Sequence, residues 1–122
     1  MEKYRFYNDK KFLGSKAGRP LRILSEYLAP LSAIQRNKVK NTIVFFGSAR
    51  IKDNEDTEIN KFYQKAKKLS YKITKWNMRN YDDNRFIITS GAGPGIMSAA
   101  NQGAKEAGGK SMGLGISLPF EQ

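Results

Sequence analysis

The sequence contains no cysteine and no histidine among its 122 residues. Without cysteine the chain has no disulfide, no zinc–thiolate site and no thiol nucleophile. Without histidine it lacks the commonest general base and the commonest metal ligand of proteins, and we predict no metal site. These absences exclude serine–histidine triads and cysteine–histidine hydrolases. Any acid–base chemistry therefore falls to carboxylates, lysine, tyrosine or bound water.

Long apolar runs are also missing. The longest strongly apolar run is Ile43 to Phe46, whereas a membrane-spanning helix needs about 20 such residues. The amino-terminal stretch from Met1 to Leu13 mixes charged and aromatic residues and has no apolar core of a signal peptide. We therefore predict a cytoplasmic protein with no membrane partner.

Acidic residues are scarce, since 22 lysines and arginines face 11 aspartates and glutamates, for a net charge of +11. Such a balance suits a polyanion, an anionic surface or a phosphorylated ligand, and the sign alone does not choose among them. The length of 122 residues suits one compact domain. Residues 1–19 show no sustained hydrophobic period and predict a loosely ordered basic arm, so that the domain occupies residues 20–122.

The predicted domain begins with a helical lead-in and continues as alternating strands and helices. Pro20 suits the first turn of a helix, which Pro30 is expected to interrupt or end. Apolar runs predict strands buried on both faces, and spacings of three or four residues predict helices. The expected strands span residues 42–46, 85–89 and 111–117, and the expected helices span residues 57–78 and 94–107. This order implies parallel pairing and an α/β fold with about half of a doubly wound sheet.

Two glycine-rich turns follow the first two predicted strands, Gly47-Ser48-Ala49-Arg50 and Gly91-Ala92-Gly93-Pro94-Gly95. Open α/β sheets bind ligands at the carboxyl ends of their strands, so these turns should lie side by side. Glycines let backbone amides approach an anion, and the helix that begins near Pro94 adds the positive end of its dipole. A phosphate or a ribose is the natural occupant.

Each of these features also has a simpler interpretation. The G-x-G-x-G spacing from Gly91 is neither the dinucleotide fingerprint nor a P-loop, and its glycines serve equally well in a tight turn. Arg50 suits a bidentate phosphate contact or a solvated loop, and Ser48 a ligand contact or a local backbone bond. The pairing of two such turns favours ligand binding.

Five lysines recur along the helix predicted over residues 57–78, interleaved with aromatic residues. Such a stripe is able to follow a nucleic-acid backbone. The solvated face of an amphipathic helix has the same pattern, and this second interpretation is favoured. Nucleic acid is therefore not the expected partner. The lysines are Lys61, Lys65, Lys68, Lys72 and Lys75.

Three stretches in one order carry a family resemblance: Phe45 to Ile51, Gly91 to Asn101, and Gly113 to Gln122. Together they resemble the Lonely Guy family of Rossmann-like nucleotide-binding proteins, long mislabelled as lysine decarboxylases. The resemblance covers about residues 18–122, including the helical lead-in. It implies a Rossmann-like three-layer parallel sheet, of which this chain would hold the amino-terminal part.

Members of that family are phosphoribohydrolases, which cleave the N-glycosidic bond of nucleoside 5′-monophosphates to a free base and ribose 5-phosphate. AMP and cytokinin riboside monophosphates are typical substrates, and no cofactor is needed. The resemblance thus implies an AMP-like ligand and a homodimer. By resemblance, the nucleotide-binding residues are Gly47, Ser48, Ala49, Arg50, Gly91, Ala92, Gly93, Pro94, Gly95, Ile96 and Met97.

This chain departs from the family pattern at several positions. The family commonly has glycine at Ala92 and glutamate at Ser98. Its arginine and its P-G-G-x-G-T-x-x-E motif, which carries the catalytic glutamate, do not occur in this chain. The oxocarbenium-like transition state of glycosidic cleavage calls for a carboxylate, and Glu121, the only one near a predicted strand end, is assigned no role, so the catalytic residues stay unknown.

We therefore expect the amino-terminal part of a phosphoribohydrolase that is inactive by itself. Two alternatives stay open. The first is a protein that binds a nucleotide or phosphosugar without turning it over. The second, less favoured, is a nucleic-acid-binding module that uses the charge of +11.

Overall fold

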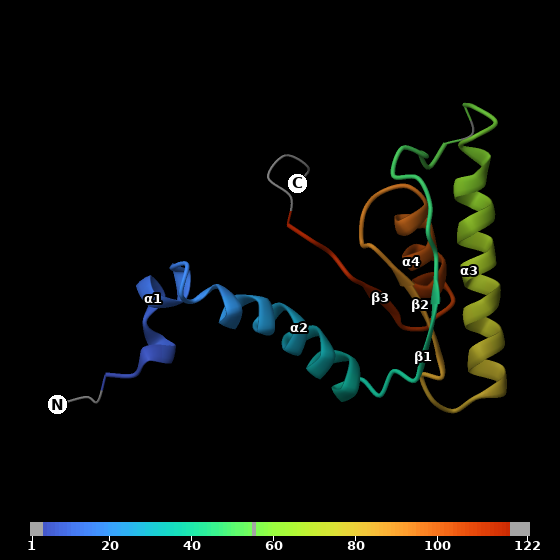
Figure 1. The fold of residues 1–122 in the computed structure, drawn as a ribbon. Helices are drawn as coiled ribbons and strands as arrows, with labels where there is room; N and C mark the ends of the chain where they lie inside the picture. The colour runs from blue at the N-terminus through green and yellow to red at the C-terminus, as the bar shows by residue number, and fades with distance from the viewer. Residues whose placement is uncertain (1–3, 55, 118–122) are drawn as a thin grey trace. The chain divides into compact units, whose positions relative to one another are not determined.

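The computed structural model describes residues 4–54 and 56–117. It divides the chain into two compact units, Met1–Asn37 and Lys38–Gln122. Figure 1 shows the order of the elements along the chain. Glu121 and the end of the third family-like stretch lie outside the described residues, as do residues 1–3 of the predicted arm. The predicted boundary after residue 19 stays a prediction.

The first unit begins with two short helices, η1 at Phe6–Asn8 and α1 at Lys10–Gly14. Asp9 caps α1, because its carboxylate accepts hydrogen bonds from the backbone amides of Lys11 at 2.9 Å and Phe12 at 3.0 Å. A hydrogen bond from the Tyr4 hydroxyl also helps to hold the pKa of Asp9 below its usual value. Local capping thus makes helical turns in a stretch whose hydrophobic pattern predicted none.

Helix α2 spans Arg19–Arg36 and has Pro20 in its first turn, as predicted. The prediction that Pro30 interrupts or ends this helix is wrong, because α2 continues to Arg36. An interior proline removes one hydrogen bond and costs about 3 kcal/mol. Here the neighbours of Pro30 include good helix formers such as Leu28, Ala29 and Leu31, which favour the helix on both sides of the ring.

The second unit contains a parallel three-stranded sheet in the order β1-β2-β3. The strands are β1 at Asn41–Val44, β2 at Phe86–Ser90 and β3 at Ser111–Gly113. This confirms the α/β class and the parallel pairing of three strands. Strand β3 is shorter than predicted, although the amide of Leu114 still donates to the carbonyl of Ser90 at 2.9 Å.

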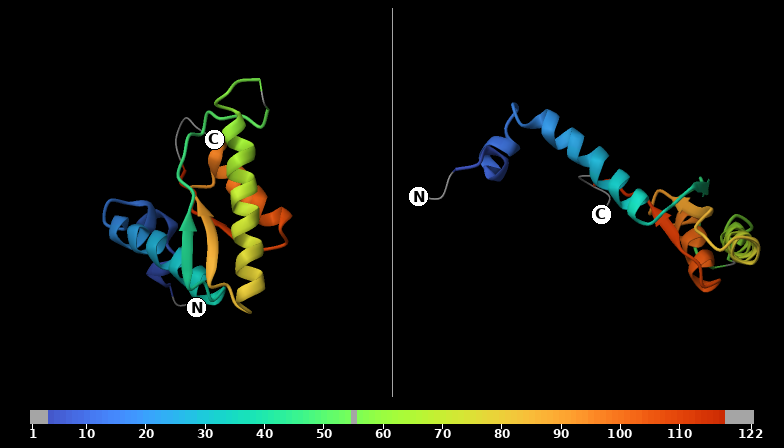
Figure 2. Two further views of the ribbon diagram at one scale, coloured as in Figure 1. Left: turned by 90° about the vertical axis from the view of Figure 1, so that its right-hand side faces the viewer. Right: turned by 90° about the horizontal axis from the view of Figure 1, so that it is seen from below.

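Both helices of this unit, α3 at Lys61–Asn80 and α4 at Ile96–Glu106, lie on one face of the sheet, as Figure 2 shows. Each begins later than predicted. The side chain of Asn60 holds the turn before α3 by accepting from the amide of Lys52 at 3.0 Å and donating to Asn54 at 2.6 Å. Gly95, with φ at 71°, lies outside the helical region, so α4 starts after it. The described part of this unit therefore has two layers, and a third layer stays a prediction.

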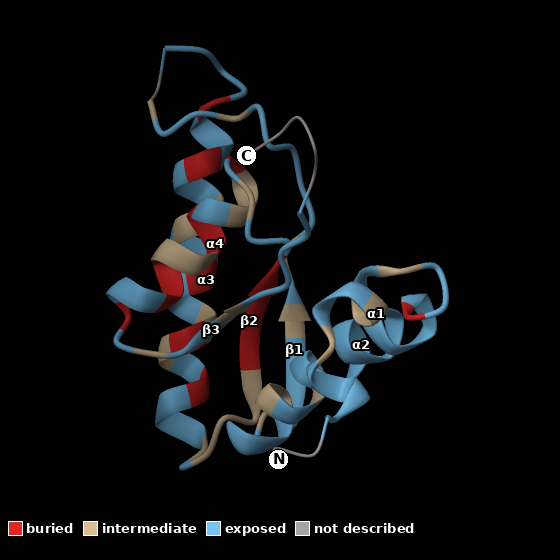
Figure 3. Cartoon of the chain, turned by 90° about the vertical axis from the view of Figure 1, so that its left-hand side faces the viewer, coloured by how far each residue is buried: buried red, intermediate tan, exposed pale blue. Residues whose placement is uncertain are grey.

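The hydrophobic core lies between β2 and the two helices. Its centre is formed by Ile88, Ala100 and Ala104, and Ile43, Phe45 and Ile73 pack against it. As predicted, small residues let α4 pack closely, and its four buried positions are Ala99, Ala100, Gly103 and Ala104. Figure 3 shows this buried surface on α3, α4 and β2.

The prediction that the first strand is buried on both faces is wrong. Val44 is 63% exposed, and Phe46, which follows β1, is 99% exposed. The physical reason is position, because β1 is an edge strand paired on one side only, whereas β2 has a strand on each side and both helices pack on it. The same prediction holds for β2, whose residues Ile87 to Ser90 are each less than one-tenth exposed. No helix in the described part of the chain is long and apolar enough to cross a membrane.

Candidate functional site

The structure confirms that the two glycine-rich turns lie side by side. The amide of Ile96 donates to the carbonyl of Ser48 at 3.1 Å, which ties the start of α4 to the turn after β1. A Cβ atom on Gly47 would lie 2.7 Å from the side chain of Ile96, and one on Gly95 would collide with the carbonyl oxygen of Ser48. Glycine is thus required at both points of contact.

The turn after β2 is held by side chains at its base. The hydroxyl oxygen of Ser90 accepts from the amide of Ala92 at 3.1 Å and from Nδ2 of Asn101 at 2.9 Å. Ala92 has a φ of 61°, in the left-handed region that glycine adopts without strain. Ala92 therefore occupies a position whose backbone conformation favours glycine.

The electrostatics of the two turns favour an anion. Helix α4 begins after Gly95 without a side-chain cap, and the carbonyl of Ser48 takes its first amide, that of Ile96, so the amides that follow and the positive end of the dipole are left for a ligand. Arg50, on the turn after β1, is exposed. The hydroxyl oxygen of Ser48 accepts from the amide of Arg50 at 3.1 Å. This is the local backbone bond that the sequence offered as the alternative to a ligand contact. The hydroxyl proton of Ser48 is still able to reach a ligand.

Two adjoining hollows, of about 550 and 610 Å³, lie beside the turns. They share Asp53, Tyr63 and Ser98 and together form one groove. Each hollow falls in the size range of small-molecule sites in proteins. The predicted site residues that line them are Ala49, Arg50, Ala92, Gly93, Pro94 and Gly95.

The other predicted site residues lie under or beside the turns. Ile96 packs beneath Gly47, and Ser48 contributes its carbonyl to the start of α4. The side chain of Met97 lies against Gly91 and Gly93, where added Cβ atoms would be 3.0 Å from its sulfur and 2.6 Å from its terminal methyl. This unbranched side chain is able to move if a ligand enters over the turn.

Sequence reasoning missed several residues of the groove. Tyr63, on α3 and only 6% exposed, donates to Oε1 of Gln102 at 3.0 Å and lies 3.4 Å from the hydroxyl of Ser98. Asp53 accepts a hydrogen bond from Gln64 and places a carboxylate where both hollows meet. The available signal was the position of Asp53 soon after the first strand, whereas the helical period of Tyr63 indicated only the core.

The groove offers hydroxyls, amides, one carboxylate and basic side chains, the groups that bind phosphorylated sugars and bases. Its basic residues include Arg50, Lys52 and Lys105. Over residues 4–54 and 56–117, no three acidic, histidine or cysteine side chains gather as metal ligands.

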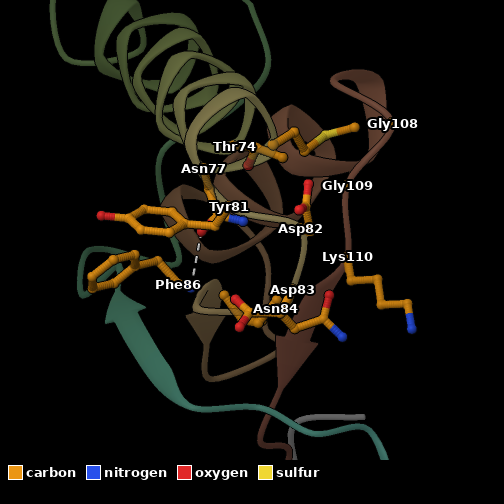
Figure 4. Close-up of a pocket in the computed structure, with 12 residues that line it drawn as sticks. Thr74, Asn77, Tyr81, Asp82, Asp83, Asn84, Phe86, Gly108, Gly109 and Lys110 are labelled. Carbon is orange, nitrogen blue, oxygen red and sulfur yellow. Dashed lines mark hydrogen bonds between the residues drawn. The ribbon is translucent and has the colours of Figure 1, made fainter.

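A third hollow, of about 380 Å³, lies at the opposite, amino end of the strands (Figure 4). Asp82 and Asp83 line it, and Nζ of Lys40 lies 2.7 Å from the Asp83 carboxylate. The hydrogen bond from Lys40 holds the pKa of Asp83 below its usual value. Two carboxylates and no helix amino terminus make this hollow unfavourable for a phosphate.

No protein-family model matches the chain, and no curated protein matches it.

Proposed function

We propose that the second unit binds a nucleoside 5′-monophosphate in the groove, with the phosphate at the paired glycine turns. One observation carries the proposal: the turn after β1 and the turn after β2 are in direct contact at the start of α4, which has no side-chain cap. Backbone amides at a helix amino terminus are a ready anion site, and the guanidinium of Arg50 suits a phosphate.

The rest of the groove suits the nucleoside. Tyr63, Ser98 and Gln102 already form a hydrogen-bonded group there, and Asp53 lies beside them. Carboxylates accept hydrogen bonds from ribose hydroxyls and base amino groups, and side-chain amides both donate to and accept from base edges. These polar side chains therefore support hydrogen bonds to a sugar and base in this part of the groove.

We further propose that this nucleotide-binding unit belongs to a Rossmann-like phosphoribohydrolase, on the family resemblance stated above. Its chemistry would be attack of water on the anomeric carbon, with release of the base and ribose 5-phosphate. A carboxylate must stabilise the oxocarbenium-like transition state. Because this chain lacks the P-G-G-x-G-T-x-x-E stretch, we expect binding but no base release from this chain alone. A homodimer is proposed on the same resemblance.

Calorimetric titration with AMP tests the binding proposal. Arg50→Ala removes a charge-assisted contact, and we expect AMP to bind roughly tenfold more weakly or worse, since such contacts contribute about 1.5–3 kcal/mol. Arg79→Ala, a matched change on the outer face of α3, should leave the affinity unchanged. Adenosine should bind more weakly than AMP. Equal affinities for AMP and adenosine, or for wild type and Arg50→Ala, would overturn the placement of the phosphate.

A second candidate function is nucleotide or phosphosugar binding without turnover. It is favoured by the state of the Asp53 carboxylate in the groove. This carboxylate already accepts a hydrogen bond from Gln64 and is therefore less available to stabilise a transition state. Chromatography of AMP incubated with this chain tests the expectation that the two candidates share. Bound but intact AMP agrees with both, whereas release of adenine would show that this chain is itself a hydrolase and would overturn both.

A further inference from the structure

One flank of α3 carries a line of exposed apolar residues, none of which lines the nucleotide groove. Phe62, Leu69 and Trp76 recur at every seventh position and are 51%, 52% and 45% exposed. Residues spaced by seven lie on one side of a helix, and this line is about 21 Å long at 1.5 Å per residue. Other residues form the buried face of α3, namely Tyr63, Ser70, Thr74 and Asn77.

Basic residues accompany the apolar line along its whole length. Helix α3 has seven basic residues and no acidic residue between Lys61 and Asn80. Lys65, Lys72 and Arg79 repeat the seven-residue spacing beside the line. Among the described residues, acidic partners are found for Lys61, with Glu58 at 2.5 Å, and for Lys67, with Glu106 at 2.7 Å. No described carboxylate therefore pairs with Lys65 or Lys72, the lysines nearest the line.

The line is held in place rather than loosely exposed. The ring of Trp76 packs edge-on against Tyr81 with centroids 5.7 Å apart, and it packs against Phe86 at 5.6 Å. The ammonium of Lys65 lies 5.1 Å from the centre of the Phe62 ring. Side chains fixed before binding lose less conformational entropy when a partner docks.

The charge and width of this surface exclude several partners. In a second copy of the chain, α3 would set basic residues against basic residues, which is unfavourable. A duplex nucleic acid would use the lysines but leave Leu69 without a contact. A membrane-bound helix needs a broad apolar face, whereas Lys65, Lys72 and Arg79 run along one side of this line. A heptad line flanked by one sign of charge is typical of helix–helix docking.

We propose that this line on α3 docks an amphipathic helix of a partner protein whose flanking positions are acidic. Apolar residues of that helix would pack between Phe62, Leu69 and Trp76, and its carboxylates would face Lys65, Lys72 and Arg79. This inference is independent of the nucleotide groove, because none of these residues lines it.

The test uses the full chain and the fluorescence of Trp76, which is the single tryptophan. The probe is a synthetic 21-residue helix with leucine in a heptad line and glutamate on both sides. We expect a saturable blue shift of the emission on titration. Leu69→Ala should weaken binding at least tenfold. Tyr71→Ala, a matched truncation on the opposite flank of α3, should not change it, and circular dichroism checks that both variants fold.

A charge swap gives a second measurement that does not depend on packing. Lys72→Glu should weaken binding of the acidic helix severalfold, and a probe with lysine at the facing positions should recover it. Equal binding of a scrambled peptide of the same charge would overturn the proposal, because charge alone would then explain it. Tighter binding of a 20-base-pair duplex, weakened by Lys72→Glu but not by Leu69→Ala, would assign the surface to nucleic acid instead.

Discussion

Strands β1 and β2 come from similar apolar runs yet differ in burial. In β2, Ile88 is 1% exposed and Thr89 is 4% exposed, whereas in β1 Val44 is 63% exposed. The two strands pair with each other, Val44 opposite Thr89. What differs is the neighbourhood, because β2 has a strand on each side and two helices above it. An apolar β-run therefore predicts a strand, while its depth depends on what the rest of the fold places around it.

The largest expected effect contrasts one residue from each strand. Ile88→Ala empties the centre of the core formed with Ala100 and Ala104 and should lower the free energy of unfolding by about 2–5 kcal/mol. Val44→Ala, on the exposed edge strand, should change it by less than about 0.5 kcal/mol. Urea denaturation followed by circular dichroism measures both.

The pair of variants is its own control, since both remove aliphatic carbons from a paired strand. Similar losses of stability in the two would mean that β1 is covered as deeply as β2, and the contrast between edge and centre would have to be abandoned.

The next effect concerns the turns that follow the two strands. Gly95→Ala forces a side chain onto a backbone with φ at 71°, where its Cβ would meet the turn after β1. We expect a loss of roughly 1–3 kcal/mol from backbone strain alone and a loss of AMP binding by calorimetry. Gly108→Ala is the matched control, because its φ is 82° but no atom lies within 4 Å of the added Cβ.

For Gly108→Ala the strain of a left-handed alanine should cost about 1–2 kcal/mol and leave AMP binding intact. If Gly95→Ala bound AMP as wild type does, contact between the two turns would not be needed for the proposed site.

The smallest expected effect joins the amino ends of the same two strands. Lys40 precedes β1, Asp83 precedes β2, and their ion pair lowers the pKa of the Asp83 carboxyl. A carboxyl whose pKa is lower in the folded state stabilises the fold above its unfolded pKa of about 3.9. That contribution is lost as pH falls through the lowered value.

Unfolding by urea at several pH values between neutral and strongly acidic checks this linkage. Asp83→Asn should flatten the acid part of the stability profile slightly, and Lys40→Gln should reduce the same slope. An unchanged profile in both variants would show that the pair contributes no net stability, as is common for exposed ion pairs.

Local sequence signals predicted the elements well and their limits less well. The apolar period of α3 and the small residues of α4 were sufficient to predict both helices. Their starts were predicted too early, because each helix starts where a residue meets a neighbouring loop. The side chain of Asn60 bonds to the amide of Lys52, and Gly95 lies against the turn after β1. Pro30 was given too much weight, since one lost hydrogen bond does not end a helix of strong helix formers.

The candidate site divides in the same way. The glycine turns could be predicted because tight backbone contact requires glycine, and parallel strands bring their carboxyl ends together. Tyr63 and Asp53 could not, because each comes from an element whose own pattern says only helix or loop. Their place in the groove depends on how α3 packs against α4.

The sequence by itself determined the α/β class, the parallel pairing of the strands, the positions of the glycine turns and the basic charge. These follow from residue periodicity, backbone freedom and composition, which are local properties. Only the tertiary structure decided that β1 is an edge, that the groove includes Tyr63 and Asp53, and that Phe62, Leu69 and Trp76 are left exposed together. Burial and proximity depend on residues distant in the chain, so no local pattern specifies them.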